Sequence, residues 1–214
     1  MTGRQLVGAL CLIVGAAPFV RAQASLSTVE GTEPNAVRRQ CARLRPVLAR
    51  VLNAQDAAEF GLLVRGDEPV ADFAEKVQNI LDPYCLVGVS INPESRVKAA
   101  RGPLKAELVR GEERIVIVKV QNDAGVTQGL KVASDQLRTA KKKDKLHWLE
   151  ASIDTRKPLE DKLTGEKLEY VVLRLTAHEA GKREATLKFD VGQGTQDLGF
   201  RAEVPILFTV KEKK

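Results

Sequence analysis

Few side chains in this sequence of 214 residues could do chemistry, and they stand far apart. The two histidines, His147 and His178, are isolated from each other and from other metal-binding residue types. A zinc site draws on several His, Cys or carboxylate groups at helical or turn spacing, and a general base needs a partner within hydrogen-bond reach. The motifs of serine hydrolases, phosphate-binding loops, zinc proteases and calcium loops do not occur. We therefore predict a non-catalytic protein without cofactor or metal.

The cysteines suggest a structural role. Cys11 lies in an N-terminal segment that we expect to be removed, which leaves Cys41 and Cys85 as a pair in an oxidising compartment. A disulfide between them would stabilise the fold by about 4 kcal/mol on the chain-entropy estimate for a loop of this length. The alternative is two buried free thiols, because an even count does not show that the sulfurs come within reach. We predict the disulfide.

The first 24 residues have the pattern of a secretory signal peptide. Arg4 precedes an apolar run over 6–20, and Arg21-Ala22-Gln23-Ala24 follows it. A positive start, a short apolar run and an Ala-x-Ala site predict cleavage after Ala24, with cleavage after Ala22 as the second choice and an uncleaved membrane anchor as the alternative. We expect an exported protein, periplasmic or extracellular, with no stable membrane span after cleavage.

The charge balance excludes some partners. The chain has 34 basic and 28 acidic side chains, and removal of 1–24 takes away two arginines and no acid. A surplus this modest, with 4% aromatic residues, does not predict nucleic-acid binding. The strongest local feature is a basic run formed by Lys141, Lys142, Lys143 and Lys145. It is a candidate patch for an anionic partner such as a polysaccharide, and the alternative is a solvated loop.

The first third of the mature chain is predicted to be helical. Residues 25–33 have no apolar period and are expected to form a flexible lead-in. From Pro34 to Asp82, apolar residues recur at three- and four-residue spacings, which indicates a small helical region. It has too few large side chains for a core of its own, so we expect it to pack on the C-terminal two thirds of the chain.

Residues 83–211 are predicted to form an immunoglobulin-like antiparallel β-sandwich. Residues 113–122 are β-branched at most apolar positions and apolar on both faces, which predicts the central strand. The runs 170–176 and 185–191 alternate strictly, which predicts a hairpin with one wet face. Alternation also places Trp148 in the core. The fold class is thus mainly β with a small N-terminal helical region.

A likeness to a known family rests on two segments. One is Asp82 to Lys98, Asp-Pro-Tyr-Cys-Leu-Val-Gly-Val-Ser-Ile-Asn-Pro-Glu-Ser-Arg-Val-Lys, and the other is Val118 to Thr127, Val-Lys-Val-Gln-Asn-Asp-Ala-Gly-Val-Thr. They resemble the accessory β-sandwich at the front of some large exported bacterial hydrolases, where a separate catalytic domain comes next in the chain. Because the sequence stops at Lys214, the resemblance implies a free-standing accessory module and carries no activity over.

These observations predict an interaction or structural module of the bacterial cell envelope that binds an envelope or extracellular protein through sandwich loops or a sheet edge. A carbohydrate-binding module is the first alternative, although the sequence supplies few aromatic platforms. A hydrolase that uses His147 or His178 is the second.

Overall fold

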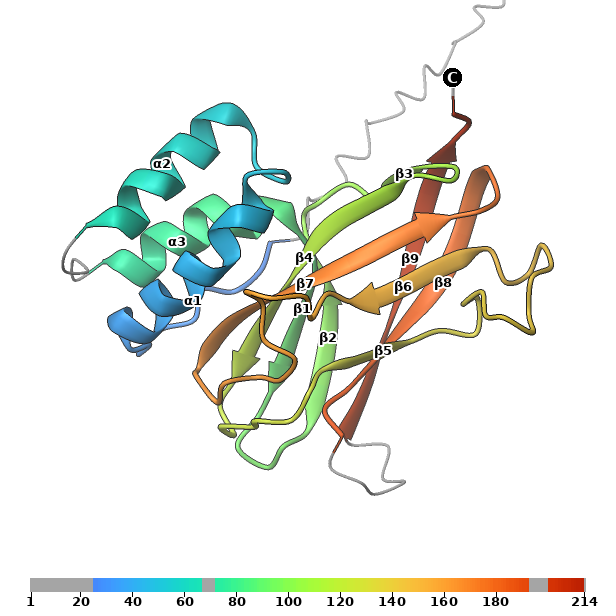
Figure 1. The fold of residues 1–214 in the computed structure, drawn as a ribbon. Coiled ribbons are helices and arrows are strands. Elements are labelled where there is room, and N and C mark those ends of the chain that lie inside the picture. The colour runs from blue at the N-terminus through green and yellow to red at the C-terminus, as the bar shows by residue number, and fades with distance from the viewer. Residues whose placement is uncertain (1–24, 67–71, 193–199, 214) are drawn as a thin grey trace, which may run out of the picture.

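The computed structural model describes residues 25–66, 72–192 and 200–213, and it shows two packed β-sheets with three helices against one of them (Figure 1). The predicted signal peptide, residues 1–24, lies outside the described residues. Within the ranges described, no helix is both long and apolar enough to cross a membrane.

The nine strands of the described residues form a sandwich. The five-stranded sheet has the order β2-β1-β4-β7-β6, and the four-stranded sheet has the order β3-β9-β8-β5. Most pairs are antiparallel, whereas β1 with β4 and β3 with β9 are parallel. The predicted immunoglobulin-like sandwich is confirmed. The strands are β1 (Cys85–Ile91), β2 (Val97–Arg101), β3 (Glu107–Val109), β4 (Glu113–Asn122), β5 (Lys131–Ala133), β6 (Leu149–Ile153), β7 (Leu168–Ala177), β8 (Gly181–Asp190) and β9 (Arg201–Lys211).

The central strand lies where the sequence predicts it. β4 is in the middle of the five-stranded sheet, between β1 and β7. Val116, Val118 and Val120 point into the core between the sheets, and none is more than 1% exposed. Ile117 and Lys119 are buried on the opposite face, because the helices and the N-terminal segment cover it. Cover on both faces explains the nearly continuous apolar run of this strand.

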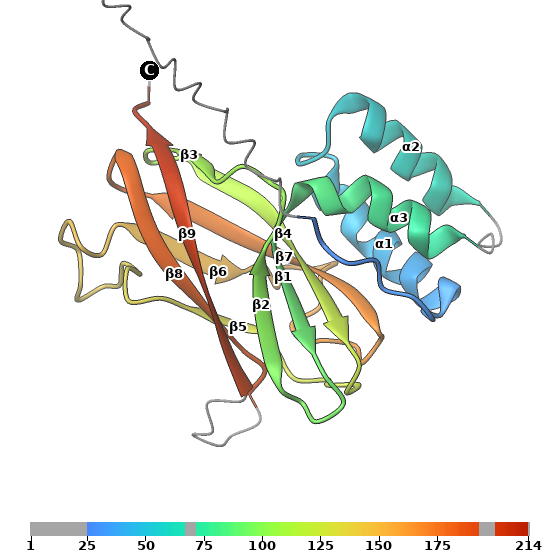
Figure 2. The same ribbon diagram turned by 180° about the vertical axis from the view of Figure 1, so that it is seen from behind.

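Three helices cover part of the outer face of the five-stranded sheet (Figures 1 and 2). They are α1 (Pro34–Leu48), α2 (Ala54–Arg65) and α3 (Phe73–Leu81), and a short 3-10 turn, Asp82–Tyr84, leads into β1. A second apolar cluster joins them to the sheet. Its members include Leu44, Phe60, Phe73 and Leu81 from the helices and Ile117, Leu168, Tyr170 and Val172 from the strands. The helical region therefore docks on the sandwich, as its small core requires.

The structure corrects the expected flexible lead-in over residues 25–33. Val29 is buried, and its backbone exchanges two hydrogen bonds with the Gln78 side chain, at 2.7 and 3.1 Å. Leu26 lies over Gly88, where a Cβ would come within 2.6 Å of Leu26 Cδ2. Leu26 and Val29 are isolated apolar residues without a periodic pattern. Their contacts with distant segments therefore cannot be predicted from the local sequence.

The predicted hairpin of 170–176 with 185–191 is wrong. β7 pairs with β4 and β6, whereas β8 pairs with β9 and β5, so the turn between them passes from one sheet to the other. Apolar and polar residues alternate in a strand that has one buried face, and the strands of both sheets in a sandwich have one buried face. The pattern therefore predicts both strands but not their partners.

Candidate interaction surfaces

The two histidines each pair with a single carboxylate. His147 Nδ1 lies 2.7 Å from Asp144 Oδ1, and His178 Nε2 lies 2.8 Å from Glu150 Oε1. In the described part of the chain, no group of three or more His, Cys, Asp or Glu residues could hold a metal ion. Pairs of this kind orient a histidine, but they bring no nucleophile or metal to it.

The predicted disulfide is not present in the structure. Cys41 and Cys85 are free thiols, both fully buried in the apolar cluster between the helices and the sheet. Burial raises the pKa of Cys41 to about 12 and also raises the pKa of Cys85. Thiols held in the neutral form by an apolar environment are poor nucleophiles, so they act as small core side chains.

The aromatic side chains that could stack on sugars are engaged elsewhere. Trp148 is 3% exposed and packs edge-on against Phe208, with ring centroids 5.7 Å apart. Tyr170 is equally buried, and the Tyr84 hydroxyl bonds to Asp56 at 2.5 Å. The buried position predicted for Trp148 is confirmed. Trp148 and Tyr170 therefore offer no free ring face for a carbohydrate, whereas Tyr84 is half-buried.

A buried ion pair joins three parts of the chain. Lys119 on β4 has a side chain only 4% exposed, and its Nζ lies 2.7 Å from Asp82 Oδ2. The same ammonium donates to the Ser27 carbonyl at 2.9 Å, and the Tyr170 hydroxyl donates to Asp82 Oδ1 at 3.1 Å. Burial raises the pKa of Asp82, while its bonds to Lys119 and Tyr170 oppose that rise. This cluster ties the N-terminal segment and the helices to the sheet.

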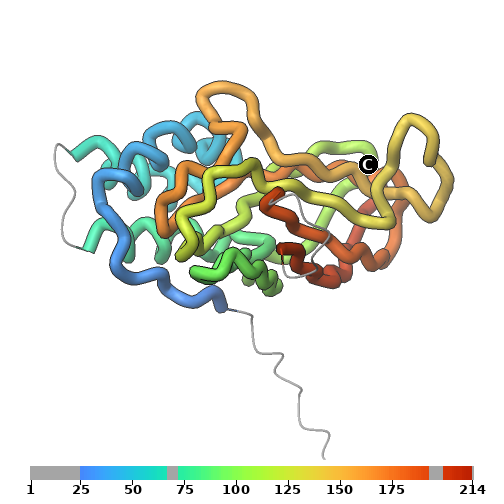
Figure 3. The backbone as a smooth tube through the Cα atoms, turned by 90° about the horizontal axis from the view of Figure 1, so that it is seen from below, coloured from blue at the N-terminus to red at the C-terminus, as the bar shows by residue number. Residues whose placement is uncertain are grey.

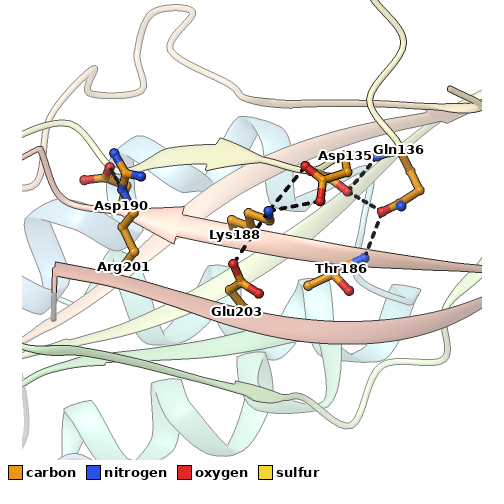
Figure 4. Close-up of polar contacts among 8 residues, drawn as sticks. Asp135, Gln136, Thr186, Lys188, Asp190, Arg201 and Glu203 are labelled. Atoms are coloured by element: carbon orange, nitrogen blue, oxygen red, sulfur yellow. Dashed lines mark hydrogen bonds and ion pairs between the residues drawn. The ribbon is translucent and has the colours of Figure 1, made fainter. Parts of the chain in front are cut away.

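The outer face of the four-stranded sheet carries a network of paired charges (Figure 4). Lys188 on β8 lies 3.1 Å from Asp135, which follows β5, and 3.6 Å from Glu203 on β9. Next to it, Arg201 pairs with Asp190 at 3.0 Å. The network holds β5, β8 and β9 in register at one end of the face, and Gln136 accepts a hydrogen bond from the Thr186 backbone at 3.2 Å.

Exposed apolar residues follow this network along β9. Pro205 and Leu207 point outward, and Leu207 is 54% exposed. An apolar centre beside a charged rim is the composition of many protein-binding surfaces. The sequence contains the signal, because both residues fall at the wet positions of an alternating strand. We name Pro205, Leu207 and the charged residues Asp135, Lys188 and Glu203 the β9 face.

The open edge of β9 is less suited to pairing with another strand. In the described chain, β3 pairs with β9 only at Thr209–Lys211, so the earlier part of β9 has a hydrogen-bonded partner strand on one side alone, although β2 lies close to it. Thr186 on β8 is paired with Pro205 on β9, and the Thr186 N–H points away from β9, toward Gln136. In an antiparallel pair of this kind the backbone nitrogen of the partner also points away, so the Pro205 nitrogen, which carries no hydrogen, faces the open edge of β9. A proline at this position blocks edge-to-edge pairing.

The predicted anionic-partner patch lies in the connection between β5 and β6. Lys141, Lys142, Lys143 and Lys145 are all exposed, and none of their side chains forms an ion pair with a described residue. Beside them, Leu146 is 75% exposed. We name residues 139–147 the basic loop. It projects from the end of the sandwich opposite the helices (Figures 1 and 3).

No family model and no curated protein matches the chain. Solved structures with partial similarity include the SrpA adhesin from Streptococcus sanguinis, which is 14% identical over 50% of this chain and 53% of that chain, with a TM-score of 0.32. The surface layer protein SbsC, domains 1–6, is 14% identical over 51% of this chain and 12% of that chain, with a TM-score of 0.29.

A third similar structure is PbICP-C in complex with falcipain-2, which is 12% identical over 50% of this chain and 87% of that chain, with a TM-score of 0.28. This chain thus spans only part of the SrpA and SbsC structures. At TM-scores this low, the similarities do not inform the function of this protein.

Proposed function

We propose that the protein is an exported, non-catalytic interaction module of the bacterial cell envelope, and that it binds a protein partner through the β9 face and the loops that border it. The observation that carries this proposal is the exposed apolar centre at Pro205 and Leu207, beside the network around Lys188. A protein interface needs an apolar centre that loses water on binding and a polar rim that fixes orientation.

The β9 face suits a recognition surface because ion pairs position its lysine before binding. Lys188 is held between Asp135 and Glu203, so its side chain has little freedom left to lose in a complex. Pro205 lacks the backbone N–H that an added strand would need at the edge of β9. Binding through the β9 face and its bordering loops is therefore favoured over pairing with a strand of the partner. Export is proposed from the signal-like residues 1–24, and the resemblance to accessory modules of exported hydrolases agrees with a supporting role.

The test is a pull-down from the envelope fraction of the producing cell at low and high salt, with captured proteins and glycans both identified. A partner protein retained at high salt is expected, because apolar contacts are not screened. Leu207→Lys should weaken capture of this partner by tenfold or more. A residue at the centre of an interface typically contributes about 2 kcal/mol to binding.

The matched control is Leu62→Lys, since Leu62 is 72% exposed on α2, away from the β9 face. Capture that Leu207→Lys leaves unchanged, or capture of glycan alone, would overturn the proposal. Turnover of a substrate that disappears on substitution of His147 or His178 would show that the protein is instead an enzyme.

A further inference from the structure

The basic loop places an exposed leucine beside lysines that form no ion pair with a described residue, whereas the lysine of the β9 face is paired with acids. The side chains of Lys141, Lys142, Lys143 and Lys145 form no ion pair with the residues that the structure describes, whereas Lys188 on the β9 face has two acidic partners. The only acidic side chain within the run, Asp144, is bonded to His147. The loop therefore presents a net positive charge that no ion pair with a described residue balances.

The backbone of the loop is ordered in a way that turns Leu146 outward. Asp144 Oδ1 accepts the backbone N–H of Leu146 at 2.9 Å and that of His147 at 3.1 Å, which closes a tight turn. On the other side, Thr139 and Lys142 exchange backbone hydrogen bonds at 3.0 and 3.3 Å. Because both turns are closed, Leu146 stands beside the lysines without packing on the core.

We propose that the basic loop docks on an anionic phospholipid surface, with its four ammonium groups among the headgroups and the Leu146 side chain inserted at the acyl-chain boundary. Lysine is a compact point charge without the fixed fork of arginine, so a row of lysines suits a diffuse anionic surface better than a shaped carboxylate site. An exposed apolar side chain beside cationic ones is the composition of segments that lie at a membrane interface.

The position of the loop permits contact with a flat surface. It projects beyond both sheets at the end of the sandwich farthest from the helices, as the three views agree (Figures 1, 2 and 3). A bilayer can therefore reach the lysines and Leu146 without meeting the helical region. This surface is separate from the β9 face, so a membrane-docked molecule can still bind a protein partner.

The test is co-sedimentation with vesicles of phosphatidylglycerol and phosphatidylethanolamine, compared with vesicles of phosphatidylcholine alone. Protein is purified from the cell that makes it, so that all variants have the same N-terminus. Binding is expected to the anionic vesicles and to weaken with salt. Each lysine near an anionic surface contributes about fivefold in affinity, the equivalent of about 1 kcal/mol, so replacing Lys141, Lys142 and Lys143 with Gln should weaken binding about a hundredfold.

Matched controls separate the loop from net charge and from general apolar exposure. A triple replacement of the exposed Lys98, Lys157 and Lys162 by Gln removes the same charge elsewhere and should leave binding nearly unchanged. Leu146→Ser should weaken binding roughly tenfold, since burial of an apolar side chain contributes to insertion, whereas Leu62→Ser should not.

Three outcomes would overturn the proposal. One is equal binding to the neutral and the anionic vesicles, and another is equal loss from the two triple variants. The third is binding to soluble polyglutamate as strong as binding to anionic vesicles and insensitive to Leu146→Ser, because the loop would then be a site for an acidic polymer or protein rather than for lipid.

Discussion

The buried ion pair of Lys119 and Asp82 offers a direct test of how the helices are held on the sandwich. Lys119→Met keeps the length and apolar stem of the side chain but removes the ammonium that reaches both Asp82 and the Ser27 carbonyl. The Asp82 side chain is only 18% exposed. Near pH 7 the variant would therefore hold a largely buried carboxylate whose remaining side-chain hydrogen-bond donor is the Tyr170 hydroxyl. A buried charge without its partner is strongly destabilising.

The expected loss is about 3–5 kcal/mol in the free energy of unfolding. That is a large fraction of the roughly 5–15 kcal/mol typical of a domain, so the variant should remain folded but with a much lower urea midpoint. Urea unfolding at about pH 7 can be followed by the fluorescence of Trp148, which is buried against Phe208. The control is Lys188→Met on the exposed β9 face, where water screens the pair and a far smaller loss is expected.

The pH dependence gives the prediction a second readout. Without Lys119, the pKa of Asp82 in the folded state should rise further above its ordinary value of 3.8. A carboxyl with a raised folded-state pKa favours folding while protonated, and that contribution is lost as the pH rises through the raised value. The destabilisation by Lys119→Met should therefore be smaller near pH 4 than near pH 7.

Asp82→Asn in the same chain should recover much of the lost stability, because no uncompensated charge remains. A loss that is independent of pH and is not reduced by Asp82→Asn would refute the reasoning. It would mean that Lys119 acts by packing alone.

Three further predictions concern other positions inside the fold. Cys41 and Cys85 should resist alkylation in the native protein and react after unfolding, and a reducing agent should leave the unfolding midpoint unchanged; a midpoint lowered by reduction would show that the disulfide forms after all. Burial raises the pKa of Glu169 in the folded state above the ordinary value of 4.5. The wild type should therefore lose stability relative to Glu169→Gln as the pH rises from 4.5 through that raised pKa. Urea midpoints of the two proteins that change equally over this pH range would contradict the prediction. Gly88→Val should destabilise by about 1–3 kcal/mol because its side chain meets Leu26, and Leu26→Ala should restore much of that loss in thermal unfolding unless the strain lies within β1 itself.

The local sequence predicts each element whose pattern depends on one buried face. The apolar run of 113–122 predicts the central strand, and β4 is that strand. Alternation predicts the buried position of Trp148, and the three- and four-residue apolar spacings predict a helical region from Pro34. The type of each residue and its period along the chain are enough for these predictions, because burial of one face fixes the conformation of a strand or helix.

Only the tertiary structure decides which faces meet. β7 and β8 alternate in the same way but enter different sheets, and Cys41 and Cys85 share a core without a bond between their sulfurs. The contact of Leu26 with Gly88 and the ion pair of Lys188 with Asp135 likewise depend on residues that are distant in the chain. A periodic pattern states that a face is buried and not what covers it, since the covering element is selected by packing of the whole chain.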